Sequence, residues 1–432
     1  MARQGLPLVA VAAGAVAGGV LLGVALERLR AGRAGRRKGG VSSSEVVKSG
    51  ADVFVDRRAL ERLVARCVEL CGASEANAAL VAQVLVAADC RGVPSHGVNR
   101  AEMYCGELRA RLIDAAAAPQ VVAGSETASV ATVDGNNGLG AVVSKFAMEL
   151  CIKKAKATGI GLVVCRRSNH FGIAGFWPEM ALREGLIGFA FTNTSPFMVP
   201  TRACQRAGGT NPIAFYCPAG EDSFQLDMAT TTVPVGKVEV CHRKQQEMPH
   251  GWGVDHTGTR STTNPAEVLN RGGLTPLGGL EETAGYKGYG LNMMVEILCG
   301  VLSGCGNVGP DVPPWRVDRS GPVDYGHCFL CIDPKKLLPE EGRFEGSLAA
   351  YLARMRSLQA ADASLPVLVP GDPEKGEERL VGVQGVRLNR NVALGLRALA
   401  RDLGCQADLP ASLSALPEDA SVPRAVGTSR TP

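Results

Sequence analysis

The stretch VATVDGNNGLGAVVSKFAMELCIKKAKATGIGLVVC, residues 130–165, decides the fold class. It begins with a short apolar run at residues 130–133, continues with a helical pattern over residues 141–156, and returns to an apolar run at residues 161–165. Short strands that alternate with a helix of this length are typical of proteins in which helices cover a sheet. The sequence therefore predicts an α/β fold.

The loop inside that stretch, GNNGLG at residues 135–140, has the glycine order GxxGxG. A dinucleotide-binding Rossmann loop has the order GxGxxG, and an acidic residue ends the next strand about 20 residues further on. No acidic residue stands at that place in this chain. We therefore interpret the loop as a tight strand-to-helix turn.

Helical patterns flank the alternating region. Residues 51–127 and 330–404 are predicted to be largely helical, and residues 128–329 to contain the sheet. The chain after Gly404 carries four prolines, which is typical of an unstructured segment. We expect a folded domain over residues 51–404 and a disordered tail over residues 405–432.

The composition excludes several classes of protein. The 432 residues are 46% hydrophobic and 20% charged and include 14 cysteines, which excludes collagen-like, disordered and disulfide-scaffold proteins. The first 50 residues contain eight Lys and Arg against two acidic residues, whereas the remainder contains 38 basic and 40 acidic residues. The body is thus nearly neutral, and we expect no nucleic-acid partner.

Residues 1–50 are predicted to be an apolar and basic anchor or targeting segment that ends in a linker. Residues 6–26 carry no charge, and six basic residues follow between positions 28 and 38. A helix of 21 residues spans about 30 Å of hydrocarbon, and the basic cluster would keep the following chain on the cytoplasmic side. We expect a membrane anchor with a cytoplasmic body. Mitochondrial import is the alternative, because an Arg-rich, acid-poor N-terminus also fits a presequence.

Two histidines lie in turn sequences, SHG at residues 95–97 and SNHFG at residues 168–172. A histidine exchanges a proton near neutral pH, which the oxidation of an alcohol or the reduction of a carbonyl requires. Arg100 follows His96 by four residues and can hold a carboxylate through two parallel hydrogen bonds. These residues predict a site for proton transfer beside a carboxylate.

Polar residues follow several predicted strands, at NTSP (193–196), GTNP (209–212) and LDMATT (226–231). Strand ends are where α/β sheets place ligands. Lys287 lies next to a glycine, and a point charge in such a turn suits a phosphate or a carboxylate. These segments predict a ligand site at the ends of the strands.

No metal site is predicted. The cysteines of the CxxC at residues 328–331 fall in the strand-like sequence GHCFLCIDP, and no second pair stands at zinc-finger spacing. His242, His250 and His256 lie in a polar loop at irregular spacing. We expect these three histidines to be exposed to solvent.

The motifs, taken in chain order, resemble the type-2 malate/L-lactate dehydrogenase family, which includes ureidoglycolate, sulfolactate and 2,3-diketogulonate oxidoreductases. The resemblance covers residues 53–404. It rests on the motifs ADCRGVPSHGVNR, DGNNGLG, SNHFGIAG, NTSPFMVP, GTNPIAF, LDMATT, VGKVEV, GWGVDHTG, GYKGYGLNMMVEILCGVLSG and GHCFLCIDP. It implies a non-Rossmann mixed sheet that binds NAD or NADP, an additional helical region, and a homodimer with active sites near the subunit interface.

The resemblance also implies roles for single residues. His170 matches the proton acceptor, His96 a catalytic acid, and Arg100 the arginine that faces the substrate; Ser95 and Asn211 complete the predicted substrate site. The positions that match cofactor contacts are Thr194, Asp227, Met228, Ala229, Lys287 and Gly288. Pro234 departs from the pattern, because it stands three residues before Lys237 where a helix would normally continue.

The predicted function is hydride transfer between NAD(P) and a small 2-hydroxy or 2-keto acid of the malate or lactate type. One alternative is the reduction of a cyclic imine acid, because an imine carbon beside a carboxylate also accepts hydride. Another is a membrane-tethered NAD(P)-binding protein without turnover. The sequence leaves open which acid is used, whether NAD or NADP is preferred, and which histidine donates or accepts the proton.

Overall fold

A computed structural model describes residues 52–243 and 245–417 of the chain. Of these residues, 52–353 and 369–417 fall in one compact unit, and residues 354–368 fall in another. Every site residue named above belongs to the first unit.

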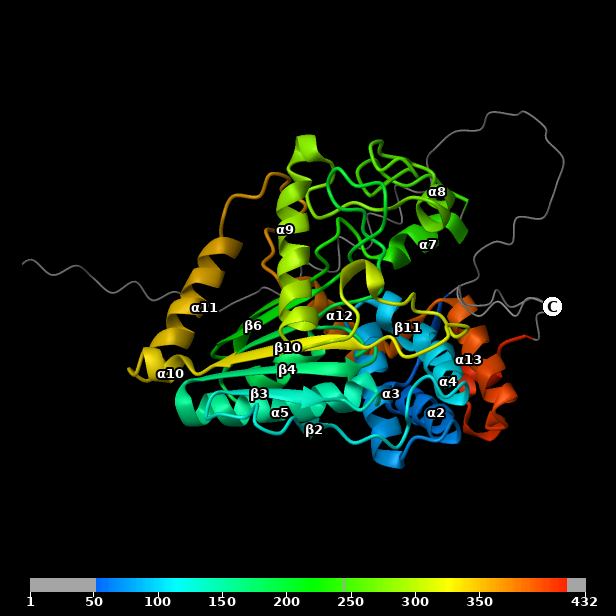
Figure 1. The fold of residues 1–432 in the computed structure, drawn as a ribbon, viewed down its shortest axis with the longest axis horizontal. Coiled ribbons are helices and arrows are strands. Elements are labelled where there is room, and N and C mark those ends of the chain that lie inside the picture. Colours follow the sequence, from blue (N-terminus) through cyan, green and yellow to red (C-terminus); the bar gives the residue numbers. More distant parts are fainter. Residues whose placement is uncertain (1–51, 244, 418–432) are drawn as a thin grey trace, which may run out of the picture. The chain divides into compact units, whose positions relative to one another are not determined.

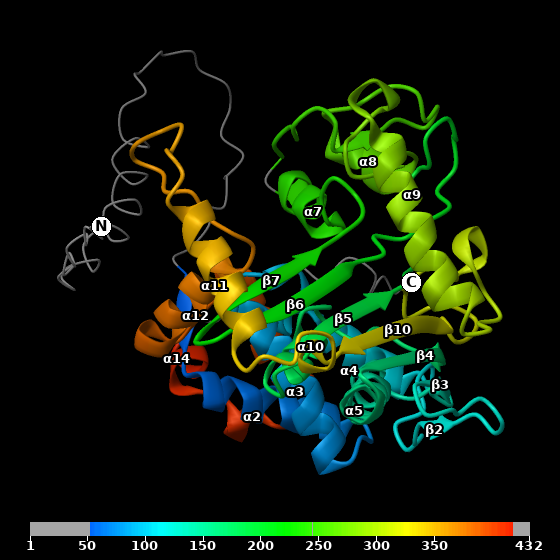
Figure 2. The ribbon, with the colours of Figure 1, turned by 90° about the vertical axis from the view of Figure 1, so that its left-hand side faces the viewer.

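A seven-stranded mixed sheet forms the centre of the unit, in the order β2-β3-β4-β10-β5-β6-β7, as Figure 2 shows. The strands are β2 (Gln120–Val121), β3 (Val130–Asp134), β4 (Ile160–Ser168), β5 (Ile187–Thr192), β6 (Ile213–Ala219), β7 (Asp222–Met228) and β10 (Tyr325–Ile332). β3 and β4 pair in parallel, and the other neighbours are antiparallel. The predicted non-Rossmann mixed sheet is confirmed, because a doubly wound dinucleotide fold has a mostly parallel sheet.

The central strands are buried on both faces, because successive side chains of a strand point to opposite sides of the sheet. On one face, Val163 and Phe329 join the main core with helices α5 (Gly140–Thr158) and α6 (Phe176–Leu182). On the other face, Val164 and Cys328 pack against Val295 of α9 (Gly285–Glu296). The apolar runs that predicted these strands are thus explained by two layers of helices.

A group of helices lies beside the sheet in Figure 1: α2 (Arg57–Leu70), α3 (Glu75–Cys90), α4 (Ala101–Arg109), α12 (Asp372–Gln384) and α13 (Arg390–Asp402). Asp56 accepts a hydrogen bond from Ala59 N–H at the start of α2, and Ser74 caps α3 in the same way. β1 (Val53–Val55), at the start of the described chain, pairs with β11 (Val386–Leu388), which lies between α12 and α13. The remaining helices are α7 (Val235–Arg243), α8 (Pro265–Asn270), α10 (Pro334–Leu337), α11 (Arg343–Arg356) and α14 (Ala411–Ser414).

The beginning of the predicted disordered tail is folded. Residues 411–414 form α14, and Leu413 is completely buried in the main core. Arg397 donates a hydrogen bond to the carbonyl oxygen of Pro417 at 2.8 Å. The prolines indicated disorder, but a single helical turn forms here because one leucine anchors it in the core. Residues 418–432 lie outside the described part of the chain.

The predicted membrane anchor is corrected. Among residues 52–243 and 245–417, no helix combines the length and the apolar character needed to cross a membrane. The core helices α2, α3, α5 and α6 pack apolar side chains against the sheet or against one another. Residues 6–26, on which both the anchor and the mitochondrial alternative rested, lie outside the described residues.

Candidate active site

The ends of five strands meet at one edge of the sheet. Ser168 at the end of β4 pairs with Tyr325 at the start of β10, and His327 of β10 pairs with Thr192 at the end of β5. β6 begins and β7 ends at the same edge, since Ile213 pairs with Met228. The loops SNHFG, NTSP, GTNP and LDMATT therefore lie side by side, where the sequence predicted a ligand site.

His327 joins two of these loops from inside the protein. Its Nε2 lies 2.7 Å from Ser168 Oγ, and its Nδ1 lies 2.8 Å from Thr192 Oγ1. Burial lowers the pKa of His327 to about 3, so the ring is neutral and acts as a hydrogen-bonding bridge. Cys328 and Cys331 beside it lie in β10 as predicted, and in the described part of the chain no three His, Cys, Asp or Glu side chains are placed to hold a metal ion.

His170 is held on two sides by aromatic residues from distant segments. Its ring stacks on Trp315, with centroids 4.2 Å apart and an angle of 11° between the planes. Tyr104 on α4 places its hydroxyl oxygen 2.8 Å from His170 Nδ1 and 3.0 Å from the His170 carbonyl oxygen. The Trp315 indole N–H donates to Glu107 of the same helix at 3.0 Å. Helix α4 thus orients both rings.

His96 and Arg100 reach the same place from the loop after α3. The rings of His96 and His170 are nearly parallel, with centroids 5.6 Å apart, and the Arg100 guanidinium lies 5.6 Å from the centre of the Trp315 ring. Arg100 Nε donates to the carbonyl oxygen of Ser95 at 2.7 Å. The structure therefore brings together the three predicted catalytic residues, of which His96 and His170 are 74 positions apart in the sequence.

The buried carboxyl group of Asp89 stabilises the loop that carries His96 and Arg100. Its Oδ2 accepts the Val98 backbone N–H at 2.7 Å, and its Oδ1 fills the space where a Cβ of Gly97 would lie, only 2.1 Å away. Burial raises the pKa of Asp89 to about 7. The glycine after His96 is therefore required by a buried carboxyl group that fixes the backbone between His96 and Arg100.

Both site histidines are partly buried and neutral at pH 7. Burial, followed by the positive charge of Arg100, lowers the pKa of His96 to about 4. Burial also lowers the pKa of His170 well below its ordinary value, with His96 as the next largest cause. A neutral imidazole can accept a proton from a hydroxyl group, which suits a general base.

The GNNGLG turn supports the His170 loop directly. Asn137 N–H donates to the Arg167 carbonyl oxygen at 2.8 Å, and Asn169 Nδ2 donates to the Gly138 carbonyl oxygen at 2.8 Å. A Cβ on Gly140 would lie 2.4 Å from the His170 carbonyl oxygen and 2.2 Å from that of Asn169. The glycines of this turn allow the backbone of the catalytic loop to approach closely.

Replacing Gly140 with alanine should therefore displace His170. Because the atoms in the way are backbone oxygens, we expect kcat to fall by up to about 100-fold, the effect of a misplacement of about 1 Å. Steady-state rates would be compared with those of Gly382→Ala, whose Cβ enters open space on α12. A Gly140→Ala enzyme as active as the Gly382→Ala control would show that this contact does not position His170.

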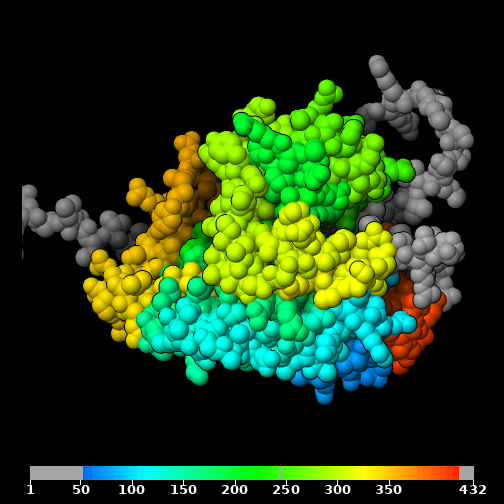
Figure 3. All heavy atoms as spheres, in the orientation of Figure 1, coloured from blue at the N-terminus to red at the C-terminus, as the bar shows by residue number. Residues whose placement is uncertain are grey.

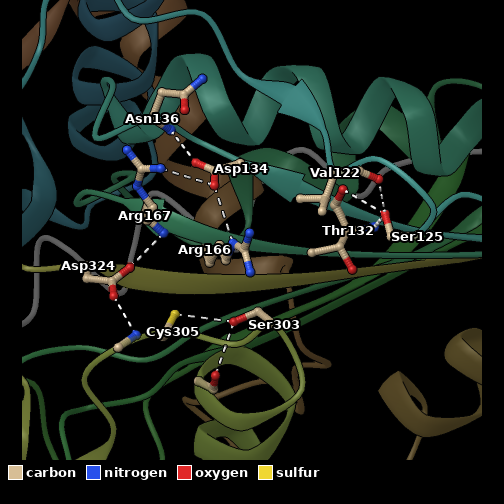
Figure 4. Close-up of polar contacts among 12 residues, drawn as sticks. Val122, Ser125, Thr132, Asp134, Asn136, Arg166, Arg167, Ser303, Cys305 and Asp324 are labelled. Atoms are coloured by element: carbon tan, nitrogen blue, oxygen red, sulfur yellow. Dashed lines mark hydrogen bonds and ion pairs between the residues drawn. The ribbon is translucent and has the colours of Figure 1, made fainter.

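A cluster of charged residues stabilises the chain just before the loop that carries His170 (Figure 4). Arg166 and Arg167 at the end of β4 each lie 3.3 Å from a carboxylate oxygen of Asp134 on β3. Asp324, before β10, accepts the Arg167 backbone N–H at 2.7 Å and the Gly306 N–H at 2.6 Å. Arg167 has a left-handed backbone with φ of 52°, which these bonds stabilise three residues before His170.

The segments that carry the predicted cofactor contacts are linked by hydrogen bonds at the strand ends. Thr210 N–H donates to Thr194 Oγ1 at 3.0 Å, and Thr230 N–H donates to the Thr210 carbonyl oxygen at 2.9 Å. Leu277 N–H donates to the Thr230 carbonyl oxygen at 2.9 Å, and a Cβ on Gly288 would lie 2.4 Å from the Leu277 nitrogen. This chain of contacts brings the end of β5, the end of β7 and the start of α9 together.

These residues suit a nicotinamide dinucleotide. Five of the six predicted positions are accessible to solvent: Thr194, Asp227, Met228, Ala229 and Lys287. Lys287 lies in the first turn of α9, where the helix N-terminus and the lysine both favour a phosphate. Gly288 is the exception, because it is buried and serves the packing of α9 against Leu277.

Asn211 does not fit its predicted contact with substrate. It is completely buried, its Oδ1 accepts the Thr194 backbone N–H at 3.0 Å, and its Nδ2 donates to Glu296 at 2.9 Å. Glu296 also accepts hydrogen bonds from Asn193 and Gly309. Asn211 is therefore a positioning residue for Thr194, and the sequence pattern alone could not separate it from its accessible neighbours.

Pro234 does not disturb the segment around Lys237. The proline stands immediately before α7, and Lys237 N–H donates to its carbonyl oxygen at 3.0 Å. A proline tolerates this place because the first helical turn needs no donor there. Gly236 of the same turn approaches Ser95 so closely that a Cβ would lie 2.8 Å from the Ser95 Cβ. The start of α7 thus contacts the predicted substrate site.

The three histidines of the polar loop are exposed as expected: His242, His250 and His256.

Sequence reasoning missed several residues that orient the site. Tyr104 follows Arg100 by one helical turn, so the spacing could have indicated it. Trp315 lies 145 residues after His170, and no local pattern connects the two. Asp89 and Glu107 had no signal, because their importance depends on burial.

The comparison with protein families decides the class of protein. The sequence model of the malate/L-lactate dehydrogenase family matches residues 55–397. The chain belongs to this family. The resemblance seen in the motifs is therefore confirmed.

Known relatives agree with the family. A malate dehydrogenase from Pyrococcus horikoshii is 38% identical over 363 residues, which are 82% of this chain and 96% of the relative. A Delta(1)-pyrroline-2-carboxylate/Delta(1)-piperideine-2-carboxylate reductase from Pseudomonas putida is 32% identical over 350 residues, 79% of this chain and 95% of the relative. A solved structure of the Pyrococcus enzyme superposes with a TM-score of 0.75 at 35% identity, covering 85% of this chain and 98% of that one.

Family membership settles the type of activity. The protein is an NAD(P)-dependent oxidoreductase that acts on small hydroxy or keto acids. The predicted enzyme class is confirmed, and a binding protein without turnover is no longer a competing explanation.

Proposed function

We propose that the protein interconverts a malate-like 2-hydroxy acid and its 2-keto acid, with Arg100 binding the carboxylate next to the reacting carbon. The observation that carries this proposal is the meeting of Arg100, His96 and His170 around Trp315, beside the strand ends that suit the dinucleotide. The bound nicotinamide supplies or accepts the hydride. The chain's own residues orient the acid and move the hydroxyl proton.

His170 is the proposed base, and Tyr104 prepares it. Two groups approach His170 Nδ1: the Gly172 backbone N–H at 3.3 Å and the Tyr104 hydroxyl at 2.8 Å. The shorter contact is satisfied when the Tyr104 hydroxyl donates to the His170 carbonyl oxygen at 3.0 Å and its own oxygen accepts the Nδ1 hydrogen of His170. The lone pair of Nε2 is then available to take the hydroxyl proton of the substrate. After that transfer the imidazolium keeps the same Nδ1 hydrogen bond, so no rearrangement is required.

His96 complements this base as a hydrogen-bond donor. Ser95 Oγ lies 2.9 Å from His96 Nδ1, and when the serine donates, the hydrogen of His96 stands on Nε2. A donor and an acceptor on neighbouring rings can serve the same substrate oxygen. This arrangement would polarise a keto group in reduction and stabilise the developing alkoxide in oxidation.

Arg100 is suited to a carboxylate because its existing partners leave part of the guanidinium uncommitted. Nε is used by the Ser95 carbonyl oxygen, whereas the ion pair to Glu239 is long, at 3.8 Å between Nη2 and Oε2. A substrate carboxylate can form a shorter, two-pronged contact with this group. Arg100 then fixes the acid with its hydroxyl carbon beside the histidines.

The substrate class is tested by following nicotinamide absorbance with purified full-length protein. Oxaloacetate, pyruvate and other 2-keto acids would be offered with NADH and with NADPH, alongside simple ketones that lack a carboxylate. We expect NADH or NADPH to be oxidised rapidly in the presence of oxaloacetate or a close analogue, and not to be oxidised in the presence of the simple ketones. Equal rates for a keto acid and for its ketone counterpart would contradict the proposed role of the carboxylate.

Reduction of a cyclic imine acid is the second candidate, supported by the match to the Pseudomonas putida reductase. An imine carbon next to a carboxylate presents the same two features to Arg100 and to the hydride. Offering a cyclic imine acid and oxaloacetate to one enzyme sample separates the two. A kcat/KM that is higher for the imine acid would assign the enzyme to the second activity.

The lowered histidine pKa values predict an unusual pH profile for oxidation. A base must be neutral, and kcat/KM reports the pKa values of the free enzyme. A histidine with an ordinary pKa of about 6.5 would lose about tenfold activity by pH 5.5, whereas the pKa of His96 is lowered to about 4 and that of His170 is also lowered. We expect no histidine titration between pH 7.5 and 5.5. The change in kcat/KM for hydroxy-acid oxidation over this range should stay well below tenfold and follow the carboxyl groups of Asp89 and Asp227, whose pKa values burial raises to about 7 and to about 6. A tenfold decline with a midpoint near 6.5 would contradict the neutral, buried pair.

We also propose that two copies of the chain associate through α9. Tyr286, Met293, Ile297 and Val301 repeat along one side of α9 and the π-helical turn that continues it, residues 297–301, and their exposed fractions range from 46% to 59%. Figure 3 shows α9 at the surface. An exposed apolar strip of this kind marks an interface, and a two-fold axis would pair it with its own copy.

Introducing charge on this strip should separate the copies. We expect Ile297→Glu combined with Val301→Glu to convert a dimer into a monomer, because two buried carboxylates at an interface lack partners. Size-exclusion chromatography with light scattering measures the mass. Val383→Glu, at a side chain of α12 that is 85% exposed, is the control and should leave the mass unchanged. A wild-type monomer at micromolar concentration would contradict the interface.

A further inference from the structure

A group of buried polar side chains lies next to the strand ends that suit the dinucleotide. Asn193 directly follows β5, Asn211 stands just before β6, and α9 contributes Asn292 and Glu296. All four residues are at most 8% exposed. The proposed hydride and proton transfers involve none of these groups, so their burial has another cause.

The carboxylate of Glu296 is the centre of this group, because it accepts hydrogen bonds from three neutral N–H groups. Its Oε1 accepts from Asn193 Nδ2 at 2.9 Å and from the Gly309 backbone N–H at 2.8 Å, and its Oε2 accepts from Asn211 Nδ2 at 2.9 Å. Such bonds allow a charged group to be buried. Both carboxylate oxygens are needed, since the two asparagines donate to different ones.

Each asparagine passes the constraint on to the backbone at a strand end. Asn211 Oδ1 accepts the Thr194 N–H at 3.0 Å, and Asn193 Oδ1 accepts the Gly326 N–H of β10 at 2.8 Å. A carboxylate can only accept hydrogen bonds, so Glu296 decides which end of each amide group faces it. The opposite end, Oδ1, is thereby presented to the backbone.

Asn292 extends the contact of α9 to the chain after β7. Its Nδ2 donates to the Gly209 carbonyl oxygen at 2.8 Å and to Thr230 Oγ1 at 2.9 Å. Asn292 and Glu296 are four residues apart and therefore share one face of the helix. This face of α9 thus holds the segments NTSP, GTNP and LDMATT together.

We propose that Glu296 is a positioning residue for the dinucleotide, which acts through Asn211 on Thr194 and keeps the strand ends in their binding geometry before the cofactor arrives. A site that is already ordered loses less conformational freedom on binding. Loss of the Glu296 contacts therefore weakens the binding of NADH or NADPH more than it lowers kcat at saturating cofactor. The inference rests on the proposed place of the dinucleotide at the strand ends.

Exchanging carboxylate and amide between the two partners tests the contact itself. In Glu296→Gln the new amide turns an N–H group toward Asn211 Nδ2, so two donors face each other. Asn211→Asp alone brings two carboxyl groups together. In the double variant the new amide donates to the new carboxylate, and the remaining oxygens still accept from Asn193, Gly309 and Thr194.

The first measurement titrates purified full-length variants with NADH and with NADPH by nicotinamide fluorescence, beside kcat and KM for oxaloacetate. We expect Glu296→Gln to raise the dissociation constant about tenfold and to change kcat at saturating cofactor less than about twofold. Asn211→Asp should also weaken binding, and the double variant should regain most of the affinity. Glu149→Gln, at an exposed side chain of α5 that pairs with Lys145, is the control and should bind as the wild type does.

Hydrogen exchange without cofactor is the second measurement, and it does not depend on where the dinucleotide binds. In Glu296→Gln, backbone exchange should be faster in peptides that contain Thr194 and Gly309, and unchanged in peptides from α2. Glu296→Asp keeps the charge but withdraws it by one carbon. It carries the same expectation and takes the place of Glu296→Gln if that variant does not fold.

The outcomes separate this inference from the proposed function. Faster exchange with an unchanged affinity for both nucleotides would overturn the positioning role, and so would equal losses of affinity and kcat, which indicate general damage to the structure. A double variant that binds no better than the single ones would overturn the pairing of Glu296 with Asn211. Wild-type protein that binds NADH but reduces no 2-keto acid would count against the proposed function alone.

Discussion

Replacing His170 with asparagine is expected to lower kcat for oxidation of the preferred hydroxy acid by roughly 100- to 10,000-fold, the usual contribution of a positioned general base. Asparagine retains a polar group beside Tyr104 but cannot accept the proton. Because the ring does not bind the carboxylate, KM should change far less than kcat. Stopped-flow or steady-state nicotinamide absorbance measures both constants.

His250→Asn is the matched control, since it makes the same change at an exposed histidine, and it should behave as the wild type. His96→Asn is expected to have a smaller effect of about tenfold, because it removes one hydrogen-bond donor and no base. The assignment would be wrong if both His170→Asn and His96→Asn turned over at the wild-type rate.

Replacing Arg100 with methionine is the second large effect. Methionine keeps much of the side-chain volume and removes the charge, so the substrate carboxylate loses its two-pronged partner. Hydrogen bonds to charged groups contribute about 1.5–3 kcal/mol each, and we expect kcat/KM for the acid to fall by at least about 100-fold. Most of the loss should be seen as a higher KM, with NAD(P) binding unchanged.

Arg100→Lys separates charge from geometry, because lysine keeps the charge but not the planar fork, and it should recover only part of the loss. Arg57→Met on α2 removes an arginine that is exposed and paired with Glu61, and it should leave kcat/KM unaltered. An Arg100→Met enzyme with the wild-type KM for the acid would place the carboxylate elsewhere.

Much of the sheet could be predicted because its signals are local. The apolar runs around the GNNGLG turn became β3 and β4 with α5 between them, since strand burial and helix periodicity are written into neighbouring residues. The polar motifs at the strand ends also lie together as expected. Paired strands of the sheet place the end of one strand beside the start or end of the next, so the loops that carry these motifs share one side of the sheet. The positions of these motifs follow from their place directly after or before a strand in the sequence.

Other parts depend on contacts between distant residues. Trp315 stacks on His170 from a segment without regular structure, and Asn211 is buried although it lies in a motif next to accessible residues. Leu413 anchors α14 within a proline-containing segment that was expected to be disordered. In each case burial in the folded chain, rather than residue type or spacing, decides the role.

The central claim is that hydride passes to the carbon of a 2-keto acid held by Arg100. The most direct measurement uses NADH or NADPH with deuterium at both C4 positions, together with oxaloacetate, and determines the product by mass spectrometry and NMR. The account predicts one deuterium on the hydroxyl-bearing carbon of malate, and at least about 100-fold slower formation of this product by Arg100→Met at the same low concentration of oxaloacetate. A product without deuterium at that carbon, or no product from oxaloacetate or any other 2-keto acid, would contradict the account.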